Sequence, residues 1–300
     1  MRILSFSGGG VRGVFGARIL EKIESEFPNA FKNVDLYAGT STGAILASGL
    51  SIGMTPTEML AMYRRLLPQI FERPMSYKLK TGWGAWGPRY LADNLQKALD
   101  QTFGSRTLGD LSKHLIIPSF DLGGEGRPWK AKFFNTWQDK DVRIADALMC
   151  SAGSAPIYFP RFSFRGRKYI DGGIATNHPS VAAISNALNE YRGQASLDDI
   201  KLISIGSGVS PQHADPSRWW GVIKWALPAL ELLQSGQESV VDYQSKALLG
   251  PRYNRIQVSM TKDVKLDDVD QIEYMVTLAN GFDLDQSDTR SFITGFWDQK

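Results

Sequence analysis

The first candidate for chemistry is a serine flanked by glycines, in the stretch Gly39-Thr40-Ser41-Thr42-Gly43. An apolar run over 34–38 precedes it and a run of small residues over 44–50 follows it, which is the strand, sharp turn and helix typical of a nucleophile elbow. In such a turn the serine adopts strained backbone angles, and side chains at both glycine positions would collide with the neighbouring strand and helix. The alternative is an ordinary strand-to-helix turn that is capped by a serine or threonine.

A glycine-rich loop, Gly8-Gly9-Gly10-Val11-Arg12-Gly13, lies between an expected strand over 2–7 and an expected helix over 14–27. It fits the G-x-G-x-x-G spacing of dinucleotide-binding loops, but it lacks both the acidic residue that should close the next strand and the Gly-Lys-Ser/Thr ending of a Walker A loop. Consecutive amides at a helix N-terminus also suit an oxyanion hole. Arg12 would then hold the loop by bonding carbonyls or add positive charge. A plain tight turn is the alternative.

The third candidate is Asp171, which follows an expected hairpin over 162–170 and precedes Gly172 and Gly173. A carboxylate at a strand end on a glycine turn is placed to project into a cleft, although Asp-Gly turns often only cap a loop. Hydrogen bonding and partial burial can raise the proton affinity of a carboxylate. We therefore expect that Asp171 can take the proton of Ser41 directly.

A conventional Ser-His-Asp triad is the alternative, because His178 and His213 both follow Asp171 in the chain. The gap from Asp171 to His178 is short for an acid and a base that must meet, and His213 lies in a polar stretch. The chain has only 3 histidines and no Cys/His spacing of a zinc site. We therefore expect neither a metal site nor a cofactor.

The elements that must position these groups alternate along the chain. Beyond those already given, we expect strands over 34–38, 115–120, 130–136, 200–205 and 253–260, and helices over 56–67, 90–103, 143–152, 178–192 and 268–280. Strands that alternate with helices of this length indicate right-handed crossovers and parallel pairing. The predicted fold class is α/β, a three-layer α/β/α sandwich with a mainly parallel central sheet. We interpret 1–300 as one domain with a mostly helical C-terminal part over 217–300.

Length and composition exclude several classes of protein. With 300 residues, 43% of them apolar and 22% charged, the chain is globular. A net charge of +3 argues against a nucleic-acid polymer as partner. Cys150 is the single cysteine, so no intrachain disulfide can form. We find neither a signal peptide nor an apolar run of the roughly 18 residues that a membrane span needs, and we expect a cytoplasmic protein with peripheral membrane contact.

Two segments combine aromatic and basic residues. Regular periodicity fails over 75–90, and we expect a structured loop there, a lid over the site or a place where a ligand meets tryptophan, tyrosine, lysine and arginine. The stretch 217–233 is the most apolar helix-like part of the chain, with an expected kink at Pro228. Its tryptophans suit a membrane interface, but we favour a helix buried in the core or in an oligomer interface.

Together, the three motifs resemble those of the patatin-like phospholipases. The glycine loop over 8–13, the serine elbow over 39–43 and the Asp171 turn occur in the order of that family, each after a strand. The turn over 151–160 is similar to the family's Ser/Ala-rich turn that ends in Phe-Pro. The resemblance runs from position 1 to about 208, and the conjunction of the motifs is highly specific although each motif alone is not.

This resemblance implies a Ser-Asp dyad that cleaves acyl esters of membrane phospholipids. Ser41 is then the nucleophile, and Asp171 is the general base that activates first the serine and later the water. The oxyanion hole would be formed by Gly8, Gly9, Gly10, Val11, Arg12 and Gly13, and the elbow and dyad would be supported by Gly39, Gly43, Gly172 and Gly173. Many members read Asn-Asn-Pro after the aspartate turn where this chain has Asn177-His178-Pro179. That departure leaves two roles for His178, a modulating one and a structural one at a helix start.

The resemblance also raises hypotheses about partners. Some bacterial members resemble effectors that cyclic nucleotides switch on in antiphage signalling, so a cyclic nucleotide activator is a hypothesis for this chain. Phospholipid at a membrane surface is the expected substrate, and self-association is a further hypothesis. Two other classes stay open, a Ser-His-Asp esterase and a non-catalytic module that binds lipid or nucleotide; the presence of both Ser41 and Asp171 weighs against the second.

Overall fold

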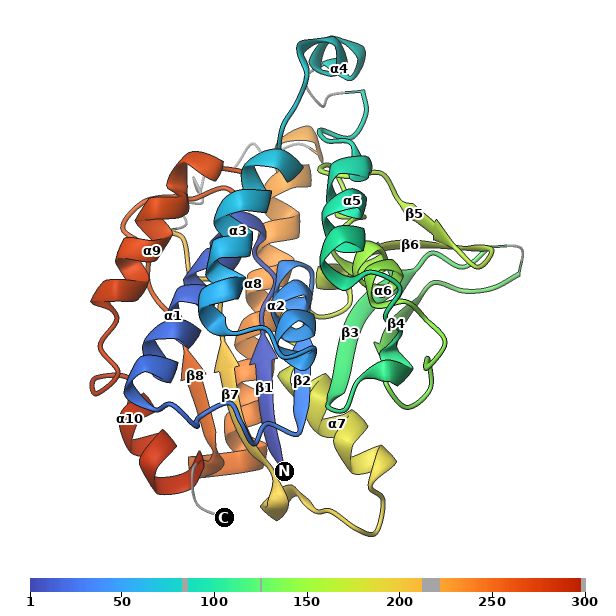
Figure 1. Ribbon diagram of the computed structural model, residues 1–300. Coiled ribbons are helices and arrows are strands. Elements are labelled where there is room, and N and C mark those ends of the chain that lie inside the picture. The colour runs from blue at the N-terminus through green and yellow to red at the C-terminus, as the bar shows by residue number, and fades with distance from the viewer. Residues whose placement is uncertain (83–85, 125, 212–221, 298–300) are drawn as a thin grey trace.

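A mixed β-sheet forms the centre of the protein (Figure 1). The computed structural model describes residues 1–82, 86–124, 126–211 and 222–297. Within these residues the strands pair in the order β5-β6-β3-β2-β1-β7-β8, and β4 also pairs with β3. Their bounds are β1 Arg2–Phe6, β2 Leu36–Gly39, β3 His114–Asp121, β4 Lys130–Asn135, β5 Phe162–Phe164, β6 Arg167–Asp171, β7 Lys201–Ile205 and β8 Tyr253–Ile256.

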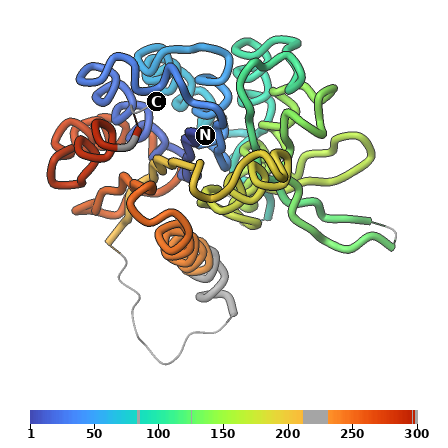
Figure 2. The backbone as a smooth tube through the Cα atoms, turned by 90° about the horizontal axis from the view of Figure 1, so that it is seen from below, coloured from blue at the N-terminus to red at the C-terminus, as the bar shows by residue number. Residues whose placement is uncertain are grey.

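Helices cover both faces of this sheet. Their bounds are α1 Gly13–Glu26, α2 Thr42–Ser51, α3 Pro56–Ile70, α4 Met75–Lys80, α5 Ala92–Phe103, α6 Ile144–Ser151, α7 Ser180–Glu190, α8 Val222–Leu249, α9 Ile272–Gly281 and α10 Thr289–Phe292. Leu4 of β1 packs in the larger core cluster with α1, α2 and α9, whereas Ile3 packs in a smaller cluster with α7. Figure 2 shows α8 on the side of the sheet opposite α1. The predicted three-layer α/β/α fold is confirmed.

The sheet is parallel in its centre and antiparallel at one edge. Strands β3, β2, β1, β7 and β8 run parallel to their neighbours in that series. Strands β4 and β6 pair antiparallel with β3, and β5 and β6 form the expected hairpin. The alternation of strands and helices predicted the parallel centre, but it contains no information on the edge, where short connections allow antiparallel pairing.

Some expected elements have different bounds. The segment over 75–90 was expected to be irregular, yet it begins with the short helix α4. The last strand ends at Ile256 rather than at 260. Of the apolar stretch over 217–233, residues 217–221 lie outside the described part, and α8 continues well beyond it to Leu249. Among the described residues, no helix combines the length and the apolarity needed to cross a bilayer.

Candidate active site

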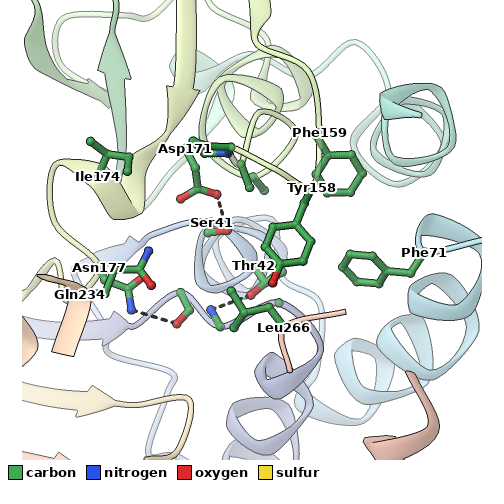
Figure 3. A pocket seen from close by; sticks show the side chains of 16 residues that line it. Ser41, Thr42, Phe71, Tyr158, Phe159, Asp171, Ile174, Asn177, Gln234 and Leu266 are labelled. Atoms are coloured by element: carbon green, nitrogen blue, oxygen red, sulfur yellow. Dashed lines mark hydrogen bonds between the residues drawn. The ribbon is translucent and has the colours of Figure 1, made fainter. Parts of the chain in front are cut away.

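Ser41 lies in the turn between β2 and α2. Its φ of 54° and ψ of −126° fall in a region that residues with a side chain rarely adopt. The turn leaves the hydroxyl at the wall of a pocket, beside Asp171 (Figure 3). The side chain makes no capping bond to α2, so the alternative of a capping serine is wrong. The local structure is the strained strand-turn-helix that the glycine spacing predicted.

Close backbone contacts explain the glycines around this turn. A Cβ on Gly39 would lie 2.2 Å from the carbonyl oxygen of Gly43, and a Cβ on Gly43 would lie 2.6 Å from the carbonyl oxygens of Phe6 and Ser7. A Cβ on Gly172, in the aspartate turn, would lie 2.1 Å from a carbonyl oxygen of β3. These distances are shorter than any real Cβ contact, so α2 and the aspartate turn can approach the sheet this closely only with glycine.

The register of the sheet brings Asp171 to Ser41. Ala38 of β2 pairs with Ile116 of β3, and Ser41 lies three residues beyond Ala38. Three residues beyond Ile116, Ser119 pairs antiparallel with Asp171, the last residue of β6. The nucleophile candidate and the base candidate therefore lie at the same level of the sheet, one after a parallel strand and one at the end of an antiparallel strand.

The two side chains are joined by a direct hydrogen bond. Ser41 Oγ donates to Asp171 Oδ2 at 2.7 Å, while the other carboxylate oxygen accepts from the N–H of Gly173 at 2.7 Å. Burial raises the pKa of Asp171 to about 6, and the hydrogen bonds from Gly173 and Ser41 partly oppose this shift. The carboxylate is thus ionised at pH 7 but considerably more basic than an ordinary aspartate.

The glycine loop lies beside the elbow, but two of its amides already have partners. The Gly8 N–H donates to the Asn177 carbonyl at 3.1 Å, and the Val11 N–H donates to the Leu266 carbonyl at 2.8 Å. Both amides were expected among the oxyanion donors. In this structure they fix the loop instead, because a carbonyl from another part of the chain occupies each one.

Gly9 and Gly10 keep their amides close to the elbow. The Gly9 N–H makes one long bond of 3.3 Å to Oγ1 of Thr42, and the Gly10 N–H donates to no acceptor in the described part of the chain. The N–H groups of Arg12 and Gly13 point back to carbonyls of the loop itself. Of the six expected oxyanion residues, Gly9 and Gly10 line the pocket and have the least strongly bonded amides, so they stay the candidates for oxyanion donors.

The side chain of Arg12 does not hold the loop by bonding carbonyls. Its Nε is buried and donates to no acceptor among the described residues. Burial lowers the pKa of the guanidinium, and the carboxylates of Glu231 and Asp263 oppose that shift. Of the two expectations for this residue, the structure favours positive charge near the helix start.

Ser151 supports the elbow, which the sequence did not predict. Its hydroxyl oxygen accepts from the N–H of Ser41 at 3.0 Å and donates to the carbonyl of Pro118 at 2.6 Å. One buried hydroxyl thus ties the strained turn to β3. The turn over 151–160 had been singled out by its resemblance to a family motif, but no local pattern distinguishes the serine that supports the elbow from its neighbours.

His178 takes no part in a triad in this structure. Its ring is fully buried, with Nε2 bonded to the hydroxyls of Ser180 at 2.9 Å and Ser204 at 2.8 Å. Burial lowers the pKa of the ring well below its ordinary range, so the imidazole is neutral. The structural role just before α7 is therefore the one observed. His213 lies outside the described residues.

A partly buried polar network connects α8 to the glycine loop. Nδ2 of Asn177 donates to the carbonyl of Gly8 at 3.1 Å and to Glu238 of α8 at 2.8 Å. Glu238 also faces Arg255 at 3.5 Å, and Arg255 donates to Ser204 at 2.7 Å. The sequence missed Glu238 and Arg255, since they are far from every motif and only the fold brings them to the site.

The pocket over the dyad is mostly apolar. It encloses about 70 Å³, which is room for a few non-hydrogen atoms. Gln234 of α8 and Leu266 contribute to its wall, so the C-terminal part also builds the site. The other residues that line it are Gly8, Gly9, Gly10, Ser41, Thr42, Phe71, Ala152, Ala155, Pro156, Tyr158, Phe159, Asp171, Ile174 and Asn177. Such a wall suits a hydrocarbon chain next to a reactive ester.

This arrangement can carry out acyl transfer. A hydroxyl bonded to a basic carboxylate, the weakly bonded amide of Gly9, the amide of Gly10 and an apolar wall are the kinds of group that ester cleavage uses. No three histidine, cysteine, aspartate or glutamate side chains of the described residues gather as metal ligands.

Comparison with known proteins identifies the family. The model of the family described as patatin-like phospholipase matches residues 4–184, more than half of the chain. The cGAMP-activated phospholipase of Pseudomonas aeruginosa is 27% identical over 273 residues, which cover 88% of this chain and 80% of that protein. The cGAMP-activated phospholipase of Vibrio cholerae is 30% identical over 247 residues, which cover 72% of this chain and 67% of that protein.

Among solved structures, VipD from Legionella pneumophila aligns with a TM-score of 0.43 and 14% identity. The alignment covers 92% of this chain and 66% of the VipD chain. The family match defines the class of protein as a hydrolase of lipid esters. The chain belongs to the patatin-like phospholipases.

Proposed function

We propose that this protein is a phospholipase of the A type, which cleaves the carboxylic ester bonds of membrane phospholipids with Ser41 as nucleophile and Asp171 as general base. The observation that carries the proposal is the 2.7 Å hydrogen bond from Ser41 Oγ to Asp171, inside an apolar pocket and next to the amides of Gly9 and Gly10. It takes substrate from the inner face of the membrane as a peripheral enzyme. No cofactor enters the reaction.

In the first half of the reaction, Asp171 accepts the proton of Ser41 while Oγ attacks the ester carbonyl carbon. The negative charge that develops on the carbonyl oxygen is stabilised by the amides of Gly9 and Gly10, near the start of α1. The carbon–oxygen bond to the glycerol part then breaks, and the leaving alkoxide takes the proton from Asp171. A lysophospholipid leaves, and the fatty acyl group stays on Ser41.

In the second half, Asp171 accepts a proton from water, and the hydroxide attacks the acyl-enzyme. The bond to Ser41 Oγ breaks, the serine recovers its proton from Asp171, and a free fatty acid is released. A carboxylate is usually a weak base for serine, but its raised pKa and direct hydrogen bond support this role.

We further propose that a cyclic nucleotide activates the enzyme, as part of an antiphage response. Two bacterial relatives at 27% and 30% identity are described as cGAMP-activated phospholipases. Self-association of the chain on activation is part of the same proposal.

Lipid analysis of phospholipid vesicles incubated with the wild-type protein, with Ser41→Ala and with His213→Ala tests the proposal. Each protein is assayed with and without cGAMP and other cyclic dinucleotides. We expect free fatty acid and lysophospholipid from the wild type and from His213→Ala, a rise with the activating nucleotide, and at least a thousandfold loss with Ser41→Ala. Unchanged hydrolysis by Ser41→Ala would refute the assignment of Ser41 as nucleophile. Loss of activity in His213→Ala would support a Ser-His-Asp triad instead of the dyad. Equal rates with and without every nucleotide would refute the proposed activation and leave the proposed hydrolysis standing.

A further inference from the structure

The segment between α3 and α5 is fixed to the rim of the pocket at both of its ends. Phe71, at the end of α3, lines the pocket and contacts the Tyr90 ring edge-to-face with a centroid distance of 5.1 Å. The N–H of Tyr90 donates to the carbonyl of Tyr158, another residue of the pocket wall, at 2.8 Å. The described residues between these two ends, 72–82 and 86–89, therefore belong to a segment that leaves and re-enters the protein at the rim of the pocket.

Between these ends, the helix α4 buries none of its residues. Figure 1 shows it standing clear of the body of the protein, at the end of the sheet where β1 and β2 lead into the site. Met75 and Leu79 are each 62% exposed, and Trp86 is 88% exposed. Single exposed apolar residues are common, but three of them among the described residues of 75–86 need an explanation.

The exposed position of Trp86 is built into the local structure. The backbone N–H of Trp86 donates to the carbonyl of Thr81 at 3.1 Å, and Thr81 Oγ1 donates to the carbonyl of Tyr77 in α4. A Cβ on Gly82 would lie 2.2 Å from the indole ring, so the ring packs directly on the glycine backbone. Thr81 and Gly82 thus hold the exposed indole of Trp86 next to the end of α4.

The charged side chains of α4 are both positive. Lys78 and Lys80 lie in the last turn of α4, and neither has an acidic partner among the described residues. Two arginines nearby are used elsewhere: Arg73 lies over the Tyr90 ring and Arg89 pairs with Asp267. The lysines of α4 are therefore the cations available to an outside partner.

We propose that Met75, Lys78, Leu79, Lys80 and Trp86, the α4 surface, dock on an anionic phospholipid bilayer. The apolar side chains enter the interface, where tryptophan is favoured, and the two lysines face the lipid phosphates. Docking there brings the mouth of the pocket against the membrane, so that a phospholipid can pass into it without crossing water. The inference rests on the proposed function for its purpose, but its binding step does not require catalysis.

A second copy of the chain fits this surface less well. A twofold contact through α4 would bring the same patch of each copy together and place Lys78 and Lys80 near their counterparts. Like charges close together oppose such a contact. Three exposed apolar side chains are also few for the core of a protein interface.

Vesicle co-sedimentation of Ser41→Ala protein tests the proposal, because that background leaves the lipid intact. The probes are vesicles of phosphatidylcholine alone and of phosphatidylcholine with phosphatidylglycerol. The test variants are Leu79→Ser/Trp86→Ser and Lys78→Glu/Lys80→Glu. The matched control is Trp129→Ser, which replaces another tryptophan, 73% exposed, that does not line the pocket.

We expect the parent and Trp129→Ser to bind the anionic vesicles equally. Leu79→Ser/Trp86→Ser should bind both kinds of vesicle at least tenfold more weakly, whereas Lys78→Glu/Lys80→Glu should lose binding only to the anionic vesicles, by roughly fivefold or more for each lysine. Binding of the α4 variants at the parent's level, or an equal loss in Trp129→Ser, would overturn the proposal. A change in sedimentation coefficient without a change in vesicle binding would also overturn it and assign the surface to self-association.

The same α4 variants with Ser41 intact are assayed on a short-chain ester that is dissolved as a monomer. We expect rates within twofold of the wild type, which separates membrane docking from misfolding and from chemistry. If the wild type cleaves no ester but binds vesicles through α4, the proposed function fails and the docking surface stands. If the wild type cleaves monomeric ester and the α4 substitutions do not change vesicle binding, the proposed docking surface is wrong and the proposed function stands.

Discussion

Two neighbouring strand-turn-helix units, which begin at β1 and β2, have the same order of elements but present different groups to the site. Strands β1 and β2 pair in parallel, with Phe6 opposite Gly39, and each leads through a tight turn into a helix. The turn after β1 presents backbone amides, while the turn after β2 presents one side chain, Ser41, at strained angles. A turn that exposes N–H groups needs glycine along its length, whereas a turn that exposes a side chain needs glycine only around it.

The two turns also differ in what holds them in place. The glycine loop is held by bonds to its own main-chain groups. The carbonyls of Asn177 and Leu266 accept from its N–H groups, and the side chains of Asn177 and Ser207 donate to the carbonyl of Gly8. The elbow is fixed by side chains, the hydroxyl of Ser151 on its N–H and the carboxylate of Asp171 on its hydroxyl. Substitutions within the loop should therefore damage it by adding side chains. Substitutions at the elbow should damage it either by removing the side chains that hold it or by adding side chains at its glycines.

The largest effect should come from removing the base. Asp171→Asn leaves the size of the side chain unchanged but cannot accept the proton of Ser41, so ester hydrolysis at pH 8 should fall by at least about a thousandfold. In the wild type, kcat/KM should fall tenfold per pH unit below about 6, because protonation of Asp171 removes the base. A pH profile that is flat from 7 to 5 would contradict this assignment.

The same substitution should stabilise the protein. The folded-state pKa of Asp171 is raised from 3.8 to about 6, so the folded state binds more protons than the unfolded state between these pH values. The free energy of unfolding therefore decreases as pH rises through this window, and the cost of the buried charge is complete above pH 6. Asp171→Asn removes that cost and should gain about 1 to 3 kcal/mol at pH 8 and nothing at pH 3. Ser41→Ala, which keeps the charge, should show no such gain in denaturant unfolding.

Glycine substitutions test the two turns against each other. Gly39→Ala places a Cβ 2.2 Å from a carbonyl oxygen of α2, and Gly10→Ala places one 2.1 Å from the carbonyl of Leu266 at a φ of 56°. Each should lower the free energy of unfolding by about 3 kcal/mol or more. Gly281→Ala is the matched control, because nothing lies within 4 Å of the added carbon. Equal stability of Gly39→Ala and Gly281→Ala in thermal unfolding would show that α2 can move away from the elbow.

These glycines also explain how much of the site could be predicted. The elbow, the loop and the Asp171 turn are visible in the sequence because each backbone conformation demands glycine within a few positions. Leu266 contributes a main-chain carbonyl, which every residue type has, so nothing in the sequence distinguishes it. Glu238 reaches the site only because α8 packs behind Asn177. The parallel centre of the sheet was predicted, but the register that puts Asp171 beside Ser41 was not.

Loss of the elbow support should have a moderate effect. Ser151→Ala removes the hydroxyl that accepts from the Ser41 N–H and leaves that buried amide without its partner. We expect a loss of about 1 to 3 kcal/mol in the free energy of unfolding. We also expect a 10- to 100-fold decrease in kcat, because the strained turn can relax. Ser154→Ala is the control, because it removes a buried hydroxyl whose one bond among the described residues is to the carbonyl of Cys150. An equal decrease in kcat there would show that the effect is not specific to the elbow.

The smallest effect should come from the one side-chain bond that joins the two turns. Thr42 begins the helix after the elbow, and its Oγ1 accepts from the Gly9 amide at 3.3 Å, a long and therefore weak bond. Thr42→Val keeps the shape of the side chain and frees this amide. If Gly9 is an oxyanion donor, the amide already exchanges Thr42 for the substrate oxygen during the reaction, so kcat should change less than threefold. A tenfold loss would mean that Thr42 sets the direction of the amide, and that the geometry of the loop depends on a side chain of the elbow.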